Sequence, residues 1–300
     1  MRKVRLHGIR DDLAARPADI RSRARLLQDV PVEEHRLDVD GTATQLLEAG
    51  QGPPIVLLHG GIQCGGVYWG PVVSRFAVSH RVLVPDVPGL GESEPLARLG
   101  ATEFADWFTA LLRLTCTEPP TLVAHSLDGS LAARFAVGRG HLLGRLVLSG
   151  VPGIGRYRPP PGLLLAATRS SLRPTEANFE RFLPWPFLDA DRARQQDPEW
   201  FAAFSAYLRS RSAVPSVRRT MRQLIRAGTK QVPDNELASI TVPTALLWGR
   251  HDRMAPLRLA EAAHKRFGWP LHVIENAGHV PFIEQPDAYL DTLAAVIAQR

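Results

Sequence analysis

Six short apolar runs, spaced along this 300-residue chain, constrain its fold more than any other feature. They are Ile55–Leu58, Val82–Val84, Leu122–Ala124, Leu146–Leu148, Ala245–Trp248 and Leu271–Ile274. Each run is followed by glycine or proline and then by a helical pattern. Continuous rather than alternating apolar runs are what parallel strands covered on both faces require. Before them, Glu34–Val39 and Thr42–Glu48 flank an Asp-Gly turn typical of a hairpin. The sequence therefore predicts an α/β fold, a doubly wound and mostly parallel sheet that begins with an antiparallel hairpin.

A long interval without a strand pattern interrupts this alternation. Residues between Leu148 and Ala245 are too many for a crossover loop, and they predict several helices rich in Phe, Trp and Arg. We therefore expect a core formed by residues 34–154 and 236–300, with a helical lid inserted at 155–235. Residues 1–33 carry charges throughout and are expected to form an N-terminal helical leader.

Composition excludes several classes of protein. Apolar residues make up 45% and charged residues 22%, which excludes a disordered or collagenous chain. No apolar run reaches the ~18 residues of a membrane span, and the first thirty residues lack the apolar core of a secretory signal. The two cysteines, Cys64 and Cys116, exclude a disulfide scaffold and a multi-cysteine zinc site. We expect a cytoplasmic protein with free thiols, acting away from membranes.

Three residues that can carry chemistry follow three of the predicted strands. Ser126 lies between a buried strand and a helix, Asp252 follows the next-to-last strand, and His279 follows the last. Taken alone, Ser126 is equally compatible with a helix N-cap, Asp252 with another cap, and His279 with a loop residue. Together, a serine, an acid and a histidine at the carboxyl ends of successive strands match the order of one triad architecture.

This pattern resembles the α/β-hydrolase superfamily, in its lid-bearing serine hydrolase branch. The resemblance extends over residues 34–300 and rests on Leu57–Ile62 (Leu-Leu-His-Gly-Gly-Ile), Pro85–Ser93, Ala124–Gly129, Gly249–Asp252 and Asn276–Pro286. It implies that Ser126 is the nucleophile, His279 the general base and Asp252 the residue that orients the imidazole. It also implies an oxyanion hole formed by the backbone amides of Gly61 and Leu127. The family needs no metal and no organic cofactor.

One position departs from the family motif. The second residue after the nucleophile is usually glycine, and here it is Asp128. An aspartate adds crowding where strand and helix backbones approach, although its charge is favourable near a helix N-terminus. Two interpretations remain open: tolerated variation, or an altered elbow whose reaction is no longer simple ester hydrolysis.

Aromatic residues gather in the predicted lid and indicate a bulky apolar or aromatic substrate. Phe182, Trp185 and Phe187, with Cys64 beyond the glycine-rich turn, are the expected substrate-binding residues. The ordinary alternative is that these aromatic side chains pack the lid helices onto the core, and that Cys64 is a buried inert thiol.

Two classes of enzyme follow from these features. The first is a serine hydrolase that cleaves an ester, a thioester or a C–C bond beside a carbonyl through an acyl-enzyme-type mechanism. The second is a non-hydrolytic tailoring enzyme, a cyclase or lyase of a natural-product or catabolic pathway, which Asp128 and the aromatic lid favour. A binding protein on an inactive scaffold would not need Ser126, Asp252 and His279 together.

The excess positive charge of the chain lies mainly in the predicted lid. The formal net charge is +6, carried by 33 Arg and three Lys against 30 acidic residues. Residues 155–235 hold fourteen basic and seven acidic residues, whereas residues 37–154 hold seven and ten. This distribution argues against a nucleic-acid-binding surface spread over the protein. It predicts that lid arginines attract an anionic substrate or an acidic carrier, such as an acyl carrier protein or a coenzyme A thioester. The alternative is the arginine-rich composition of a GC-rich genome. The oligomeric state is left open between a monomer and a homodimer.

Overall fold

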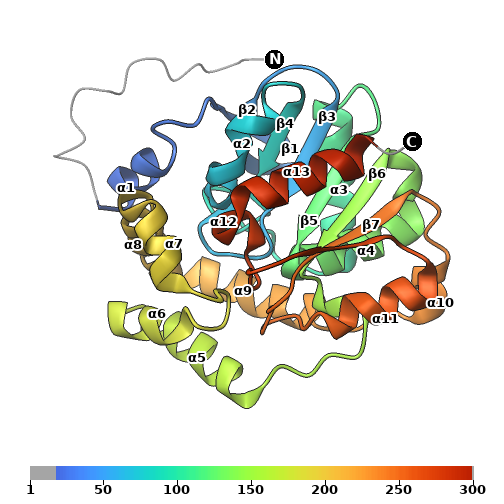
Figure 1. Cartoon of the computed structure of the whole chain (residues 1–300). Coiled ribbons are helices and arrows are strands. Elements are labelled where there is room, and N and C mark those ends of the chain that lie inside the picture. Colours follow the sequence, from blue (N-terminus) through green and yellow to red (C-terminus); the bar gives the residue numbers. More distant parts are fainter. Residues whose placement is uncertain (1–17, 299–300) are drawn as a thin grey trace.

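A single sheet of eight strands forms the centre of the computed structural model, which describes residues 18–298 (Figure 1). Its strands are β1 (Glu33–Val39), β2 (Thr42–Ala49), β3 (Pro54–Leu58), β4 (Arg81–Pro85), β5 (Thr121–His125), β6 (Arg145–Ser149), β7 (Thr244–Gly249) and β8 (Leu271–Ile274). The spatial order is β1-β2-β4-β3-β5-β6-β7-β8. β1 pairs with β2, and β2 with β4, in antiparallel fashion, while all later pairs are parallel. The predicted fold class is therefore confirmed, and the six apolar runs lie in β3 to β8.

Helices cover both faces of this sheet, so alternate strand residues enter two separate apolar clusters. Val56 and Leu58 of β3 join the cluster under α3 (Ala101–Thr115), α4 (Ser126–Arg139) and α11 (Arg258–Phe267). Ile55 and Leu57 join the cluster on the opposite face, under α2 (Gly70–Phe76) and α13 (Pro286–Ala298). Burial on both faces explains why these strands are continuously apolar in sequence.

The segment between β6 and β7 is helical wherever it forms regular structure. It contains α5 (Pro161–Leu172), α6 (Glu176–Phe182), α7 (Ala190–Gln196), α8 (Pro198–Ala213), α9 (Pro215–Gly228) and α10 (Asp234–Ala238). Proline occupies the first turn of α5, α8 and α9, where its missing amide costs nothing. The side chains of Thr175, Asp189 and Asp197 cap the starts of α6, α7 and α8. Local sequence signals therefore set where most of these helices begin.

The helix α1 (Ala18–Leu26) packs beside α8, far from it in sequence (Figure 1). Leu26 is buried, and Arg23 forms an ion pair of 2.6 Å with Glu34 of β1. The described part of the predicted leader thus contacts both the sheet and the helical segment. Residues 1–17 of that leader lie outside the described residues.

One further short helix follows the last strand. The turn α12 (Pro281–Glu284) directly precedes α13 and brings Glu284 into the protein interior. Among residues 18–298, no helix has the length and apolar character needed to cross a membrane.

Candidate active site

Ser126 stands at the sharp turn where β5 ends and α4 begins. Its φ is +49°, a left-handed conformation that is strained for a non-glycine residue. The residue is buried apart from 7% of its surface. A serine with strained backbone at a sharp strand-to-helix junction matches the geometry of a nucleophile elbow. A simple helix cap would not require this conformation.

The structure brings the predicted serine, histidine and acid into one hydrogen-bonded chain. Ser126 Oγ lies 2.9 Å from His279 Nε2, and His279 Nδ1 lies 2.8 Å from Asp252 Oδ2. The second oxygen of Asp252 accepts the amides of Met254 at 2.8 Å and Ala255 at 2.7 Å. Because Nδ1 faces a carboxylate it carries the proton, which leaves Nε2 free to accept the proton of the hydroxyl.

The surroundings hold the imidazole of His279 in place. The His279 amide donates to the carbonyl oxygen of Pro186 at 2.8 Å, which ties the histidine loop to the segment between α6 and α7. The ring of His125 lies 4.6 Å from that of His279, and its Nδ1 donates to the Ser149 carbonyl oxygen. Burial lowers the pKa of His125 well below its ordinary value, so this neighbour is neutral and packs against the site.

The glycine turn after β3 is held by the unexpected Asp128. Gly60 and Gly61 have φ values of +83° and +72°, and both of their amides donate to Asp128 Oδ2 at 3.0 Å. His59 Nδ1 lies 3.4 Å from the same oxygen, and His59 Nε2 accepts the amide of Val87 at 3.0 Å. Burial raises the pKa of Asp128 to about 7, and the hydrogen bonds from Gly61 and Gly60 partly oppose that rise.

The two predicted oxyanion donors therefore have different surroundings. The Leu127 amide lies in the first turn of α4, where helical amides have no intrahelical acceptor. The Gly61 amide, in contrast, already donates to Asp128. The sequence identified Asp128 as unusual but did not predict this hydrogen bond. The local signal for an acceptor at this turn was the pair of glycines, Gly60 and Gly61, whose amides can approach a carboxylate closely.

The predicted substrate-binding residues divide into two groups. Cys64 and Phe187 are buried in one apolar cluster, and the Phe187 ring lies 5.8 Å from that of Phe201. Burial raises the pKa of the Cys64 thiol well above its ordinary value. Phe182 and Trp185 are half-buried and lie outside that cluster.

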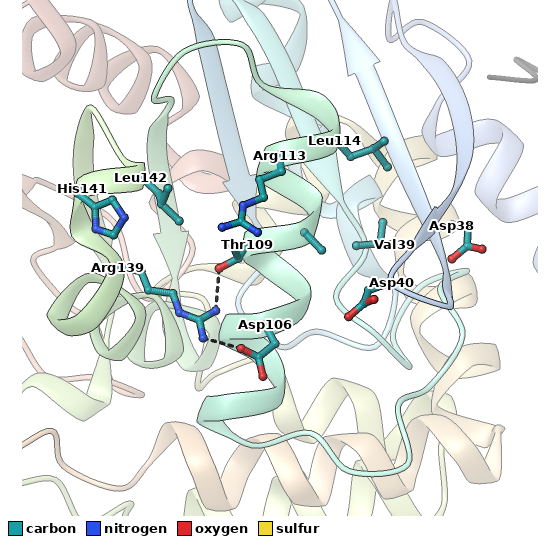
Figure 2. A pocket seen from close by; sticks show the side chains of 11 residues that line it. Asp38, Val39, Asp40, Asp106, Thr109, Arg113, Leu114, Arg139, His141 and Leu142 are labelled. Carbon is teal, nitrogen blue, oxygen red and sulfur yellow. Dashed lines mark hydrogen bonds and ion pairs between the residues drawn. The ribbon is translucent and has the colours of Figure 1, made fainter.

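One surface cavity lies near the site, and a second lies away from it. One, of about 490 Å³, lies beside the histidine loop and is lined by Pro184, Phe187, Leu188, Asp189, Ala190, Asp191, Arg192, Ala193, Asn276, Glu284 and Gln285. The other, of about 870 Å³, lies between the β1–β2 turn and the ends of α3 and α4 (Figure 2). In that second groove Arg139 reaches across to Thr109 at 2.7 Å and to Asp106, so its charge is already paired (Figure 2).

No metal centre accompanies this arrangement in the described part of the chain. Between residues 18 and 298, no three His, Cys, Asp or Glu side chains are grouped so that they could hold a metal ion.

Comparison with known proteins places the chain among hydrolases of this architecture. Residues 55–292 match the model of the Alpha/beta hydrolase family. A pimeloyl-[acyl-carrier protein] methyl ester esterase from Vibrio atlanticus is 26% identical over 264 residues, which cover 82% of this chain and 95% of the relative. An uncharacterized protein from Mycobacterium tuberculosis is 27% identical over 256 residues, covering 81% and 74%. The structure of a 2-hydroxy-6-oxo-6-phenylhexa-2,4-dienoate hydrolase from a Rhodococcus strain superposes with a TM-score of 0.79 at 21% identity, covering 90% of this chain and 100% of that one. At that identity the structural likeness shows the fold alone.

Proposed function

The chain belongs to the alpha/beta hydrolase family, and we propose that it is a serine hydrolase cleaving an ester, a thioester or a C–C bond beside a carbonyl. One observation carries this proposal: the hydrogen-bonded chain from Ser126 through His279 to Asp252. Each of the three side chains has the partner that nucleophilic acyl transfer requires.

In the proposed reaction, Ser126 Oγ attacks the carbonyl carbon as its proton passes to His279 Nε2. The carboxylate of Asp252 stabilises the imidazolium that forms and keeps its orientation. The imidazolium then protonates the leaving group, and the carbonyl re-forms as an acyl-enzyme. His279 then deprotonates a water molecule, which attacks the acyl carbon, and the resulting imidazolium returns the proton to Ser126 Oγ as the acyl group leaves. The amides of Leu127 and Gly61 would stabilise the negative oxygen of the tetrahedral intermediate.

Helix α9 supports this proposal by covering the site. A Cβ on Gly61 would meet a methyl carbon of Leu224 at 2.5 Å, and one on Gly228 would meet Leu127 at 2.9 Å. The apolar face of α9 therefore lies directly on the glycine turn and on the elbow. Such a cover excludes water from the acyl group and strengthens the electrostatic interactions around it.

The substrate we propose is a bulky apolar or aromatic acyl compound. The apolar surface of the acyl site would be provided by Phe182, Trp185, Phe187 and Cys64. Of these, Phe187 lines the cavity beside the histidine loop. The relative from Vibrio atlanticus is an esterase of a pimeloyl-[acyl-carrier protein] methyl ester, which supports an acyl substrate.

An acidic carrier is the partner that the charge of α9 supports. Arg219, Arg222 and Arg226 are exposed on this helix, and Arg218 is half-exposed. We propose that they attract an anionic substrate, an acyl carrier protein or a coenzyme A thioester. Reversing Arg222 and Arg226 to Glu should lower kcat/KM for acyl-carrier substrates about tenfold and leave p-nitrophenyl esters unaffected. The matched reversal of Arg113, in the groove of Figure 2, should change neither.

The experiment that tests the hydrolase proposal combines labelling with a substrate screen. A fluorophosphonate should label Ser126 in the folded protein, and Ser126→Ala should lose both the label and the turnover of p-nitrophenyl esters and acyl thioesters of graded chain length. The matched control is Ser239→Ala, an exposed serine after α10, which should keep both. Absence of the adduct in active wild-type protein would refute the proposed nucleophile.

The arrangement of Asp128 favours a second candidate, a non-hydrolytic cyclase or lyase. A site in which the Gly61 amide already donates to Asp128 stabilises an oxyanion less strongly. Full turnover of the natural substrate by Ser126→Ala would favour this candidate. For either candidate, the free thiols of Cys64 and Cys116 support a cytoplasmic location.

A further inference from the structure

The amides of Gly60 and Gly61 form a small anion-binding site that a side chain of this protein fills. These two consecutive residues have positive φ, and their N–H groups point to one acceptor. Asp128 Oδ2 sits at that point, 3.0 Å from both nitrogens. Asp128 has no exposed surface, so water does not replace it there.

No cation neutralises this carboxylate within the part of the chain that the structure describes. His59 is the ionisable side chain that faces it, and its Nε2 accepts the amide of Val87, so the ring is neutral. Burial lowers the pKa of His59 to about 3, in agreement with this assignment. Two histidines lie on neighbouring elements. His125 is hydrogen-bonded to the Ser149 carbonyl oxygen, and His279 is hydrogen-bonded to Ser126 and Asp252.

The second oxygen of Asp128 adds no hydrogen bond to those made by the first. Asp128 Oδ1 has no hydrogen-bond partner among residues 18–298, although it is completely buried. The two amides therefore provide the hydrogen bonds that stabilise the buried charge. A proton on the carboxyl group would remove the charge and weaken its attraction for both amides.

An oxyanion at Ser126 and the carboxylate of Asp128 compete for the same donor. A backbone amide has one hydrogen, and that of Gly61 is directed to Asp128 Oδ2. Glycine, the usual residue of the motif, would have no side chain to compete. The Leu127 amide has no such competitor, because it lies in the first turn of α4.

We propose, on the basis of the serine hydrolase function argued above, that Asp128 is a positioning residue that restrains hydrolysis by holding the Gly61 amide away from the carbonyl oxygen of a substrate at Ser126. The complete pair of oxyanion donors forms only when this hydrogen bond is released. Asp128 acts through the turn and makes no contact with the reacting atoms.

Two substitutions at Asp128 test this restraint. Asp128→Gly frees the Gly61 amide, and it should raise kcat for a p-nitrophenyl ester at pH 8 by about a hundredfold, the lower end of the effect of one oxyanion donor. KM should change little, because the ground-state carbonyl gains less than the transition state. Asp128→Asn keeps the shape and a neutral acceptor, so kcat should rise only a few-fold. An unchanged or lowered kcat in both variants would overturn the proposal.

The pH profile distinguishes restraint from a purely structural role. The ratio of kcat in Asp128→Asn to kcat in wild type cancels the pH effects that both proteins share. This ratio should exceed one above about pH 7 and fall towards one below it, because the wild-type carboxyl group then carries a proton. A ratio independent of pH would contradict the restraint.

A matched control uses Asp86, another buried carboxylate that accepts backbone amides. Asp86 accepts the amides of Gly66 and Glu92, and burial raises its pKa to about 6. Asp86→Asn should leave kcat within about twofold and should not reproduce the pH-dependent ratio.

Fluorophosphonate labelling keeps this inference separate from the proposed function. If Ser126 is not labelled in any variant, the hydrolase proposal fails. If Ser126 is labelled at the same rate in wild type, Asp128→Gly and Asp128→Asn, the hydrolase proposal stands and the restraint fails. If Asp128→Gly does not fold, as judged by circular dichroism, the rate and pH ratio of Asp128→Asn decide.

Discussion

Glu284 joins the histidine loop to the segment between α6 and α7. Its removal should lower both the free energy of unfolding and the rate of ester hydrolysis. One carboxylate oxygen accepts the amides of Leu188 at 2.7 Å and Asp189 at 3.2 Å, while the other accepts the Gly278 amide at 2.6 Å. Only 4% of the Glu284 surface is exposed. Gly278 directly precedes His279, so this carboxylate holds the backbone that carries the candidate base.

The expected cost of Glu284→Ala follows from the burial of the three amides. A buried donor left without an acceptor costs about 1–3 kcal/mol, and the Gly278 amide is the fully buried one. Leu188 is half-buried and Asp189 is exposed, so water can replace part of those bonds. A Cβ on Gly278 would lie 2.8 Å from the Leu188 nitrogen, which shows that water has little room between the segments. We expect a loss of about 3 to 4 kcal/mol in the free energy of unfolding.

Urea unfolding and ester hydrolysis at one fixed pH measure the two effects of this substitution. Loss of the tie should also lower kcat/KM by about ten- to a hundredfold, because small displacements of a catalytic group are costly. The control is Glu275→Ala on the same loop, an exposed residue paired with Arg250, which should change neither quantity measurably. A loss below about 1 kcal/mol for Glu284→Ala would show that the three bonds contribute little and would refute this reasoning.

Three further substitutions or modifications have expected outcomes. Asp252→Asn should lower kcat about 10⁴-fold while the protein stays folded, because the imidazole loses its orienting carboxylate; steady-state kinetics and circular dichroism measure this. A thiol reagent should modify half-buried Cys116 slowly and Cys64 only upon unfolding, since burial raises the pKa of Cys64; a fast Cys64 reaction in the native protein would contradict this. The folded-state pKa of Asp128, about 7, lies above its ordinary value, so the folded state binds the proton more tightly. Stability relative to Asp128→Asn should therefore be greatest below about pH 4, fall between pH 4 and 7, and be constant above; urea titrations across that range test the sign.

The sheet and the chain order of Ser126, Asp252 and His279 could be predicted because each leaves a local signal. Buried parallel strands must be apolar on both faces, and glycine or proline marks where each ends. The carboxyl ends of parallel strands meet at one edge of a sheet, so residues just after β5, β7 and β8 had to be neighbours. Topology thus converts sequence order into proximity.

The packing of α1 and of the aromatic residues could not be predicted in the same way. Nothing in residues 18–26 identifies α8 as the partner of this helix, since any amphipathic surface would accept it. Phe182, Trp185 and Phe187 are near one another in sequence, yet only Phe187 enters the cluster that contains Cys64. The helical periodicity of a short segment does not specify which neighbour each side chain meets.

The loops at this edge of the sheet are held by buried carboxylates that accept backbone amides. Asp86, Asp128, Asp252 and Glu284 each accept at least two amides, and none of the four has more than 6% of its surface exposed. Every residue except proline offers an amide, so the partner of such a carboxylate leaves no trace in the sequence. In the case of Asp252, the carboxylate also places charge beside His279, where it can affect reactivity as well as structure. For Asp128, structure and reactivity oppose each other, because the bonds that hold the glycine turn use the Gly61 amide, which we propose as an oxyanion donor.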